Sequence, residues 1–273
     1  MTNLVKRSLS GALFVAVIIG SILLGSIVFA GVFSIVCALA VHEFHKITNH
    51  KQDVEVSLWL PIIGSLILFI SSYVSASGLI NLPIYIVYGS YMILAFVIEL
   101  FRQKPNPVHN WAYFLLGQIM VALPFSLLSY IYFIDNQTNA LLLLSIFITI
   151  WVNDSFAYLF GVSFGKHRLF ERVSPKKSWE GFMGGAIGAL LSGYVFSMYF
   201  NQFSLFEWIL MSELIIIFAT LGDLIESLLK RTLDVKDSGN AIPGHGGLLD
   251  RFDSMLMVVP VVYLYLLIII ALR

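Results

Sequence analysis

Charged residues are scarce in this chain. Only 12% of its 273 residues are Asp, Glu, Lys or Arg, and 16 basic residues balance 16 acidic ones. A net charge of zero gives no bulk attraction for nucleic acid, so we expect no nucleic-acid partner. There is one cysteine, Cys37, which excludes an intramolecular disulfide and a cysteine-based metal site.

Apolar residues take the place of the missing charges. They make up 59% of the chain, which is well above the share of about half in a soluble domain. The apolar runs recur at close to the roughly 20 residues that cross a bilayer as a helix. The sequence therefore predicts an all-α polytopic integral membrane protein with about nine transmembrane helices. The predicted spans are 8–25, 27–44, 57–75, 80–101, 111–134, 139–161, 181–200, 206–229 and 254–272.

Basic residues predict the orientation. With the N-terminus in the cytoplasm, 15 of the 16 Lys and Arg residues fall on the cytoplasmic side, and only Arg273 falls outside with the C-terminus. We expect one integral-membrane domain over 1–273, with N-terminal helices in 1–134 and a catalytic half in 139–273. Two long polar loops, 165–180 and 230–253, are then cytoplasmic.

The stretch 222–254 is the most polar part of the chain, because eleven of its 33 residues are charged or histidine. Asp223, Glu226 and Lys230 are spaced to lie along one face of a helix. Ionisable groups inside a span usually face a cavity or a partner, which favours a site for a charged ligand. The alternative is a structural ion pair between Lys230 and either Asp223 or Glu226.

The loop that follows combines glycines with carboxylates. Pro243–Gly247 can bring backbone amides close to an anion, because glycine tolerates the dihedral angles of such a nest. Asp250 and Asp253 begin the last helix, where oxygen ligands suit Mg²⁺. The alternative is that either carboxylate only caps that helix.

The other polar loop contains Ser174-Pro-Lys-Lys-Ser178. Its hydroxyl and ammonium groups are a compact set of hydrogen-bond donors for phosphate oxygens. The alternatives are charge that merely obeys the positive-inside rule, or contact with anionic lipids. Small residues spaced by four on both sides of this loop favour close helix packing. Three acidic residues in or near spans have no assigned role: Glu43, Glu99 and Glu213.

These motifs together resemble the phosphatidate cytidylyltransferase family. The resemblance rests on Ser227…Lys230-Arg231, Lys236-Asp237, His245-Gly-Gly247 and Asp250-Arg-Phe-Asp253, supported by Asp154…Tyr158…Gly161 and 174–181. It implies that CTP and phosphatidate are converted to CDP-diacylglycerol and pyrophosphate with Mg²⁺, beside which the family has a second cation. It also implies a homodimer in the cell (inner) membrane among membrane lipids, with a cytoplasmic active site.

Roles follow from the resemblance together with the residue types. The predicted metal ligands are Asp223, Asp250 and Asp253. The predicted catalytic residues are Asp223, Asp250, Lys230, Lys236 and Asp237. The predicted substrate-binding residues are Ser174, Lys176, Lys177, Ser178, Lys230, Arg231, His245, Gly246, Gly247 and Arg251.

Two other classes of protein share parts of this pattern. A transporter of an anionic solute would also have carboxylates in its spans, but we would expect them at midplane in matched halves. CDP-alcohol phosphotransferases and prenyltransferases need several aspartates at short spacing, and Asp250–Asp253 is only a fragment of such a set.

Overall fold

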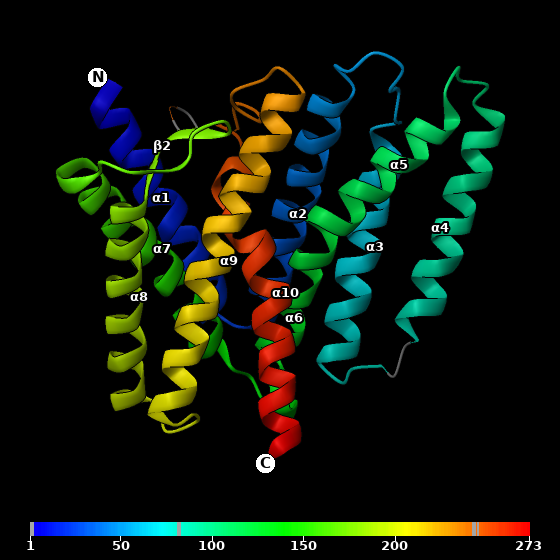
Figure 1. Cartoon of the computed structure of the whole chain (residues 1–273). Helices are drawn as coiled ribbons and strands as arrows, with labels where there is room; N and C mark the ends of the chain where they lie inside the picture. Colours follow the sequence, from blue (N-terminus) through cyan, green and yellow to red (C-terminus); the bar gives the residue numbers. More distant parts are fainter. Residues whose placement is uncertain (1–2, 81–82, 242–243, 245) are drawn as a thin grey trace. The chain divides into compact units, whose positions relative to one another are not determined.

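The computed structural model describes residues 3–80, 83–241, 244 and 246–273, and helices dominate this part of the chain (Figure 1). The elements, in chain order, are α1 (Asn3–Leu23), α2 (Ser26–Thr48), α3 (Trp59–Ala76), α4 (Ile84–Phe101), α5 (Pro107–Gly117), a π-helical turn (Gln118–Ala122), α6 (Leu123–Tyr132), a 3₁₀ turn (Ile134–Asn136), α7 (Ala140–Phe164), β1 (Arg168–Phe170), β2 (Ser174–Ser178), α8 (Trp179–Tyr199), α9 (Leu205–Thr232) and α10 (Leu249–Leu272).

These helices confirm the predicted all-α membrane fold. Eight helical segments of the described residues are long and apolar enough to cross a membrane, and 8–23 forms a shorter apolar helix. One of the eight runs from α5 through the π-helical turn into α6. The boundaries differ near the polar loops: α9 ends at Thr232 and α10 begins at Leu249. Several predicted site residues therefore lie on helices rather than in a loop.

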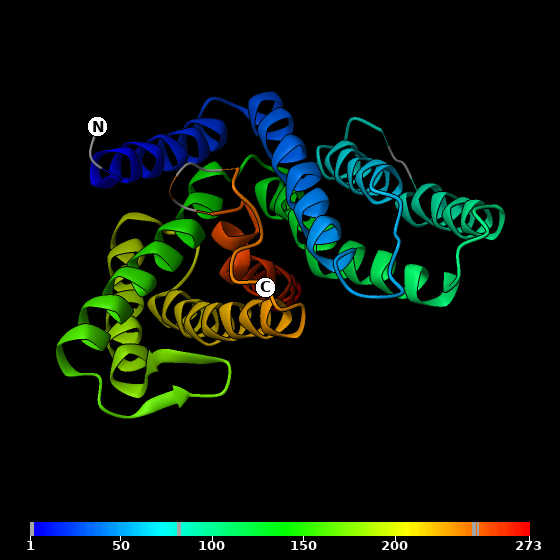
Figure 2. The same cartoon turned by 90° about the horizontal axis from the view of Figure 1, so that it is seen from above.

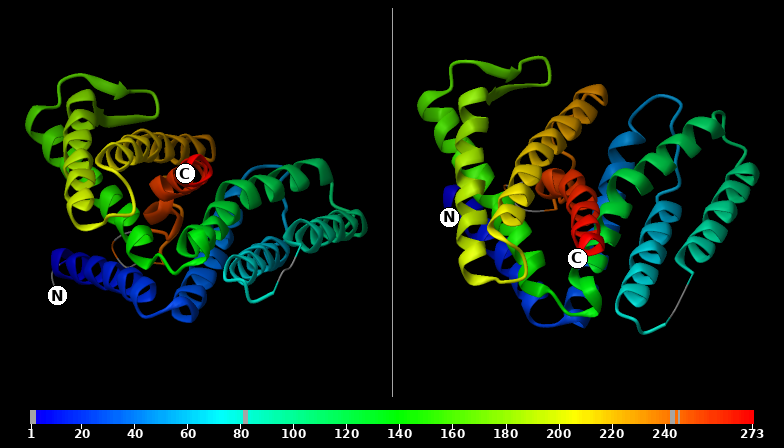
Figure 3. Two further views of the ribbon diagram at one scale, coloured as in Figure 1. Left: turned by 90° about the horizontal axis from the view of Figure 1, so that it is seen from below. Right: turned by 60° about the horizontal axis from the view of Figure 1, so that its bottom comes forward.

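The chain divides into two units, 1–140 with 232–252 and 141–231 with 253–273. The predicted division into an N-terminal part and a catalytic half stays a prediction. In the first unit, α2 packs against α1, α3 and the α5–α6 segment, and α3 packs against α4 and α6. Figure 3 shows α3 and α4 as an antiparallel pair. The centre of this unit is aromatic, with Phe29 stacked on Tyr132 at a centroid distance of 4.5 Å.

Two local features shape the first unit. Gly25 separates α1 from α2 at the predicted position, and its φ of 115° is one that side chains rarely allow. Gln118 begins the π-helical turn and is buried, where its amide donates to the Pro61 carbonyl at 3.0 Å and accepts from the Tyr88 hydroxyl at 2.8 Å.

In the second unit, glycines bring α7 and α8 close together. A Cβ on Gly181 would lie 2.9 Å from the Ala157 carbonyl, and a Cβ on Gly185 would overlap the side chain of Asn153. Farther along α8, a Cβ on Gly193 would meet the Ser212 side chain of α9. The packing interpretation of these small residues is therefore confirmed.

A β-hairpin occupies much of the predicted polar loop 165–180. Strands β1 and β2 pair antiparallel, with Arg168 opposite Ser178 (Figure 2). Ser178 ends β2 and caps α8, because its hydroxyl accepts from the Gly181 amide at 3.1 Å. Glu180 holds the base of the hairpin by accepting from the amides of Lys166 and His167 at 3.1 and 3.2 Å. The hairpin is thereby fixed to the start of α8.

Candidate active site

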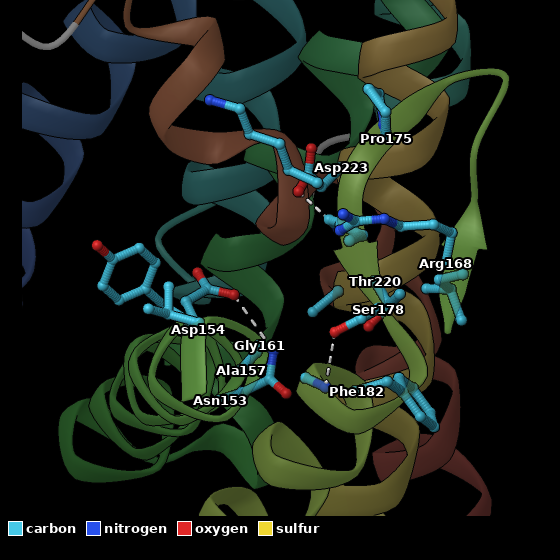
Figure 4. Close-up of a pocket in the computed structure, with 17 residues that line it drawn as sticks. Asn153, Asp154, Ala157, Gly161, Arg168, Pro175, Ser178, Phe182, Thr220 and Asp223 are labelled. Atoms are coloured by element: carbon cyan, nitrogen blue, oxygen red, sulfur yellow. Dashed lines mark hydrogen bonds and ion pairs between the residues drawn. The ribbon is translucent and has the colours of Figure 1, made fainter. Parts of the chain in front are cut away.

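A pocket of about 540 Å³ lies in the second unit, which is a size typical of small-molecule sites. Its walls come from α7, the hairpin, the start of α8 and the middle of α9 (Figure 4). Polar groups on these walls include Asp154, Arg168, Lys176, Lys177 and Asp223. The pocket therefore has both signs of charge beside apolar side chains such as those of Tyr158 and Phe182.

An ion pair links the hairpin to α9 at this pocket. The Lys177 ammonium lies 2.5 Å from a carboxylate oxygen of Asp223, and both side chains are partly exposed, at 27% and 32%. The other Asp223 oxygen accepts from the Ser227 hydroxyl at 3.2 Å. Because both partners remain accessible, their pairing can be exchanged for contacts with a ligand.

On the opposite wall, α7 presents Asp154 to the pocket (Figure 4). Its carboxylate accepts from the Asn153 side-chain amide at 3.2 Å. Asn153 is buried against α8, where Gly185 leaves room for it. The tight α7–α8 packing thus fixes the Asn153 side chain, which in turn holds the Asp154 carboxylate at the pocket.

Three carboxylates come together along α9 and the first turns of α10. One ligand oxygen each from Asp223, Glu226 and Asp253 lies within 4.8 Å of the others. Glu226 also pairs with Lys230 at 2.6 Å, and both of these side chains are largely buried. Gly222 permits the close approach of α10, because a Cβ there would lie 2.6 Å from the Asp253 carbonyl.

The glycine loop is the segment 233–248. Its described residues, 233–241, 244 and 246–248, belong to the first unit. The Asp250 carboxylate, in the first turn of α10, accepts from the Gly247 amide at 2.8 Å and from the Ser238 amide at 3.0 Å. Gly246 has a φ of 85°, and a Cβ on it would lie 2.7 Å from Asp250 Oδ2. Asp250 therefore organises the loop through backbone amides.

Comparison with known proteins identifies relatives along nearly the whole chain. The sequence model of the "Cytidylyltransferase family" matches residues 5–269. The chain belongs to this family.

Curated relatives agree with the match. The phosphatidate cytidylyltransferase of Staphylococcus haemolyticus is 43% identical over 143 residues, which is 51% of this chain and about half, 55%, of the relative. The enzyme of the same name from Staphylococcus saprophyticus is 34% identical over 258 residues, which is 81% of this chain and 99% of the relative. The phosphatidate cytidylyltransferase of Bacillus subtilis is 31% identical over 278 residues, which covers 97% of this chain and 98% of the relative. The resemblance predicted from the motifs is confirmed.

The structure brings some of the predicted site residues of this family member together. Lys176, Lys177, Ser178 and Asp223 line one pocket, and Asp223 lies near Asp253. Ser174 begins β2 just before these lysines and is half-buried. Their predicted roles in binding stay predictions.

Other predicted residues have different surroundings. Lys230 pairs with Glu226, as one sequence alternative proposed, whereas Asp223 pairs with Lys177. Four further residues are exposed: Arg231, Lys236, Asp237 and Arg251. Asp250 lies in the other unit from Asp223 and Asp253, so the predicted three-aspartate ligand set stays a prediction. His245 lies outside the described residues.

The predicted site residues left out three contributors to these sites. Arg168 lines the pocket and was not among the predicted substrate-binding residues. Glu226 joins the carboxylate cluster, and Glu43 contacts the glycine loop. The signal for both glutamates was their position within apolar helices, where an ionisable group is costly, and Glu226 also has helical spacing from Asp223.

Proposed function

We propose that this protein is a membrane nucleotidyltransferase that makes CDP-diacylglycerol and pyrophosphate from CTP and phosphatidate. Family membership and the near-full-length relatives support this activity and do not favour the transporter alternative. The observation that carries the proposal is the pocket wall on which Lys177 and Asp223 pair, beside Lys176 and Ser178. This wall offers hydrogen-bond donors for phosphate oxygens and carboxylate oxygens for a metal ion in one place.

The chemistry requires two anions to meet. A phosphate oxygen of phosphatidate attacks the α-phosphorus of CTP and forms a new P–O bond, while the bond to the pyrophosphate oxygen breaks. Positioning and charge neutralisation supply most of the catalysis in such transfers. Lys176, Lys177 and Arg168 line the pocket, and we propose that these three cations pair with phosphate oxygens. Apolar residues of the same pocket suit the non-phosphate parts of a substrate.

The carboxylate cluster fits a divalent cation. Asp223, Glu226 and Asp253 offer oxygen atoms within 4.8 Å of one another, and oxygen is the donor that Mg²⁺ prefers. We propose that these three residues hold Mg²⁺. From the family resemblance we also propose that Asp250 is a metal ligand and that a second cation is bound. When bound, the metal neutralises charge on phosphate oxygens. Lys177 would then leave Asp223 for a substrate phosphate.

We also propose that the polar loops face the cytoplasm from the cell membrane and that the protein is a homodimer. The charge pattern supports the orientation. In the second unit, the hairpin and the Lys230 end of α9 lie at the same end (Figure 1). In the first unit, Lys104 pairs with Glu55, which joins the two loops on either side of α3 and α4. The homodimer rests on the family resemblance.

One assay tests the activity directly. Purified protein is incubated with labelled CTP, phosphatidate and Mg²⁺, and the label is followed into a lipid-soluble nucleotide. We expect labelled CDP-diacylglycerol and one pyrophosphate per turnover. A lysine variant of the pocket, described in the Discussion, serves as the control. Transport of an anionic solute by folded protein, with no lipid-linked nucleotide formed, would overturn the proposal.

The orientation has its own test. Cysteines replacing Gln137 and Asn240, both of which are exposed, are treated with an impermeant thiol reagent added to intact cells. The native Cys37 is buried and gives the background. We expect Gln137→Cys to react from outside and Asn240→Cys to react only after lysis. Equal labelling of both positions in intact cells contradicts the proposed orientation.

A further inference from the structure

The glycine loop is fastened to α2 by one buried carboxylate, Glu43. Its side chain is only 7% exposed and lies in a helix that can span the membrane. Glu43 Oε2 accepts from the Ser238 hydroxyl at 3.2 Å and from the Leu249 amide at 3.0 Å. A carboxylate at such a position is costly unless donors satisfy it, and here both donors come from the loop and its helix.

The Leu249 contact determines where α10 begins. Leu249 is the first residue of α10, so its amide has no partner within the helix. Glu43 supplies that partner from another helix and adds a negative charge at the N-terminal end, where the helix dipole favours it. The carboxylate of α2 therefore acts as the cap that the loop itself does not provide at this amide.

Ser238 connects Glu43 to Asp250 through two hydrogen bonds. The Ser238 hydroxyl donates to Glu43, while the Ser238 amide donates to both oxygens of Asp250, at 3.2 and 3.0 Å. The Asp250 carboxylate is thus held by a residue that Glu43 holds. Two independent routes, through Ser238 and through Leu249, connect Glu43 to the start of α10.

Two glycines make room for Glu43. A Cβ on Gly239 would lie 2.6 Å from Glu43 Oε1, and a Cβ on Gly247 would overlap both Glu43 Oε2 and the Ser238 hydroxyl. Neither glycine has a positive φ, so steric space rather than backbone conformation explains them. The loop is built around the carboxylate of α2.

We infer that Glu43 is a positioning residue for Asp250: it fixes the start of α10 and the Ser238 contact, and thereby the direction of the Asp250 carboxylate. The inference rests on the proposed function for its effect on turnover. Outer partners that orient a functional carboxylate commonly change metal affinity or activity by roughly 10- to 100-fold when removed. Glu43 itself touches no reacting atom.

The test compares Glu43→Ala with Glu43→Gln and with a matched control, Glu99→Ala. Glu99 is equally buried in the first unit, at 5% exposure, and is bonded to Arg102 and Asn110 at 2.5 and 2.6 Å. We expect Glu43→Ala to lower kcat roughly 10- to 100-fold per folded molecule and to raise the Mg²⁺ concentration needed for half-maximal activity. Glu43→Gln keeps an oxygen that accepts from both donors, so it should restore most of kcat.

Glu99→Ala should lower the melting temperature in detergent while leaving kcat per folded molecule unchanged. Amide hydrogen exchange measures the positioning independently of turnover. Glu43→Ala should speed exchange of the Gly247 and Leu249 amides, and Glu99→Ala should not. Failure of the wild-type assay with this exchange pattern intact would reject the proposed function alone. Unchanged kcat and exchange in Glu43→Ala would overturn the inference, as would a Gln variant as impaired as the Ala variant.

Discussion

Two pairs of carboxylates, one pair in each unit, are satisfied by different kinds of partner. In the second unit, Asp223 and Glu226 pair with the ammonium groups of Lys177 and Lys230. In the first unit, Asp250 is bonded by backbone amides, and Glu43 by one amide and one hydroxyl. A lysine side chain can swing away when a metal or phosphate arrives, whereas a backbone amide cannot move without changing the fold.

This difference separates two roles for the same chemical group. The lysine-paired carboxylates are suited to exchange partners during a reaction, and the amide-bonded ones are suited to hold a loop in place. Changes to Asp223, Glu226 or their lysine partners should therefore affect turnover or substrate affinity with little loss of stability. Changes to Glu43, to Asp250 or to the loop that they hold should affect stability and turnover together.

The largest effect is expected for Asp223→Asn. The amide keeps the shape but loses the charge that a hard cation and Lys177 require, so turnover should fall on the order of 10²-fold or more. Steady-state assays at several Mg²⁺ concentrations, with melting temperature measured in detergent, check this. Glu213→Gln, an exposed site on the same helix, is the matched control and should be neutral. Near-normal turnover of Asp223→Asn at limiting Mg²⁺ would show that the Asp223 carboxylate is not a metal ligand.

Lys177→Ala should raise the apparent KM for CTP roughly tenfold, the equivalent of losing one charge-assisted hydrogen bond of about 1.5 kcal/mol. The measurement is the CTP dependence of the rate in neutral detergent. Lys166→Ala removes a charge from the same segment but not from the pocket lining, and it should leave KM unchanged. An equal response of the two variants would favour a general attraction to anionic lipid.

Gly247→Ala should lower both stability and turnover, because its Cβ would overlap Ser238 and Glu43. A loss of roughly 1–3 kcal/mol of unfolding free energy is typical of such overpacking. Combining it with Ser238→Ala removes one of the overlapping atoms, so the double variant should be more stable than the sum of the two single changes. Melting temperatures of all three variants decide this. Strict additivity would show that the overlap is relieved elsewhere.

The smallest effect is expected for Lys104→Ala, which breaks an ion pair on the surface of the first unit. The hydrogen bond and charge of Lys104 lower the pKa of Glu55, so the pair adds stability while Glu55 is ionised and loses it as pH falls through the folded-state pKa. The pair is solvent-exposed and contributes little. The melting-temperature difference from wild type should be small at pH 7 and absent in acid, with turnover unchanged. A large loss of turnover would contradict the separation of roles drawn above.

Much of the architecture could be predicted before the structure was known. Apolar runs of bilayer length located the spans, and Gly25 marked the break between the first two. The motif residues predicted the family that the relatives confirm. Small residues spaced by four predicted the close packing of α7 on α8. Each of these signals depends on neighbouring residues or on a fixed periodicity.

Contacts between distant segments could not be predicted in the same way. The partner of Lys177 is 46 residues away on α9, and Glu43 meets Ser238 across 195 residues. The sequence explained Gly246 and Gly247 by the approach of a phosphate, whereas the structure shows that Cβ atoms there would overlap the side chains of Asp250 and Glu43. A sequence does not state which donors will surround a carboxylate.

The sequence by itself determined that this chain crosses a membrane, that its charges concentrate in two polar segments, and which family it belongs to, because hydropathy and local motifs follow directly from residue order. Tertiary structure alone decided which carboxylates are paired with lysines and which with backbone amides. That choice depends on how helices far apart in the chain pack, and it separates the residues that can exchange partners from those that hold the loop.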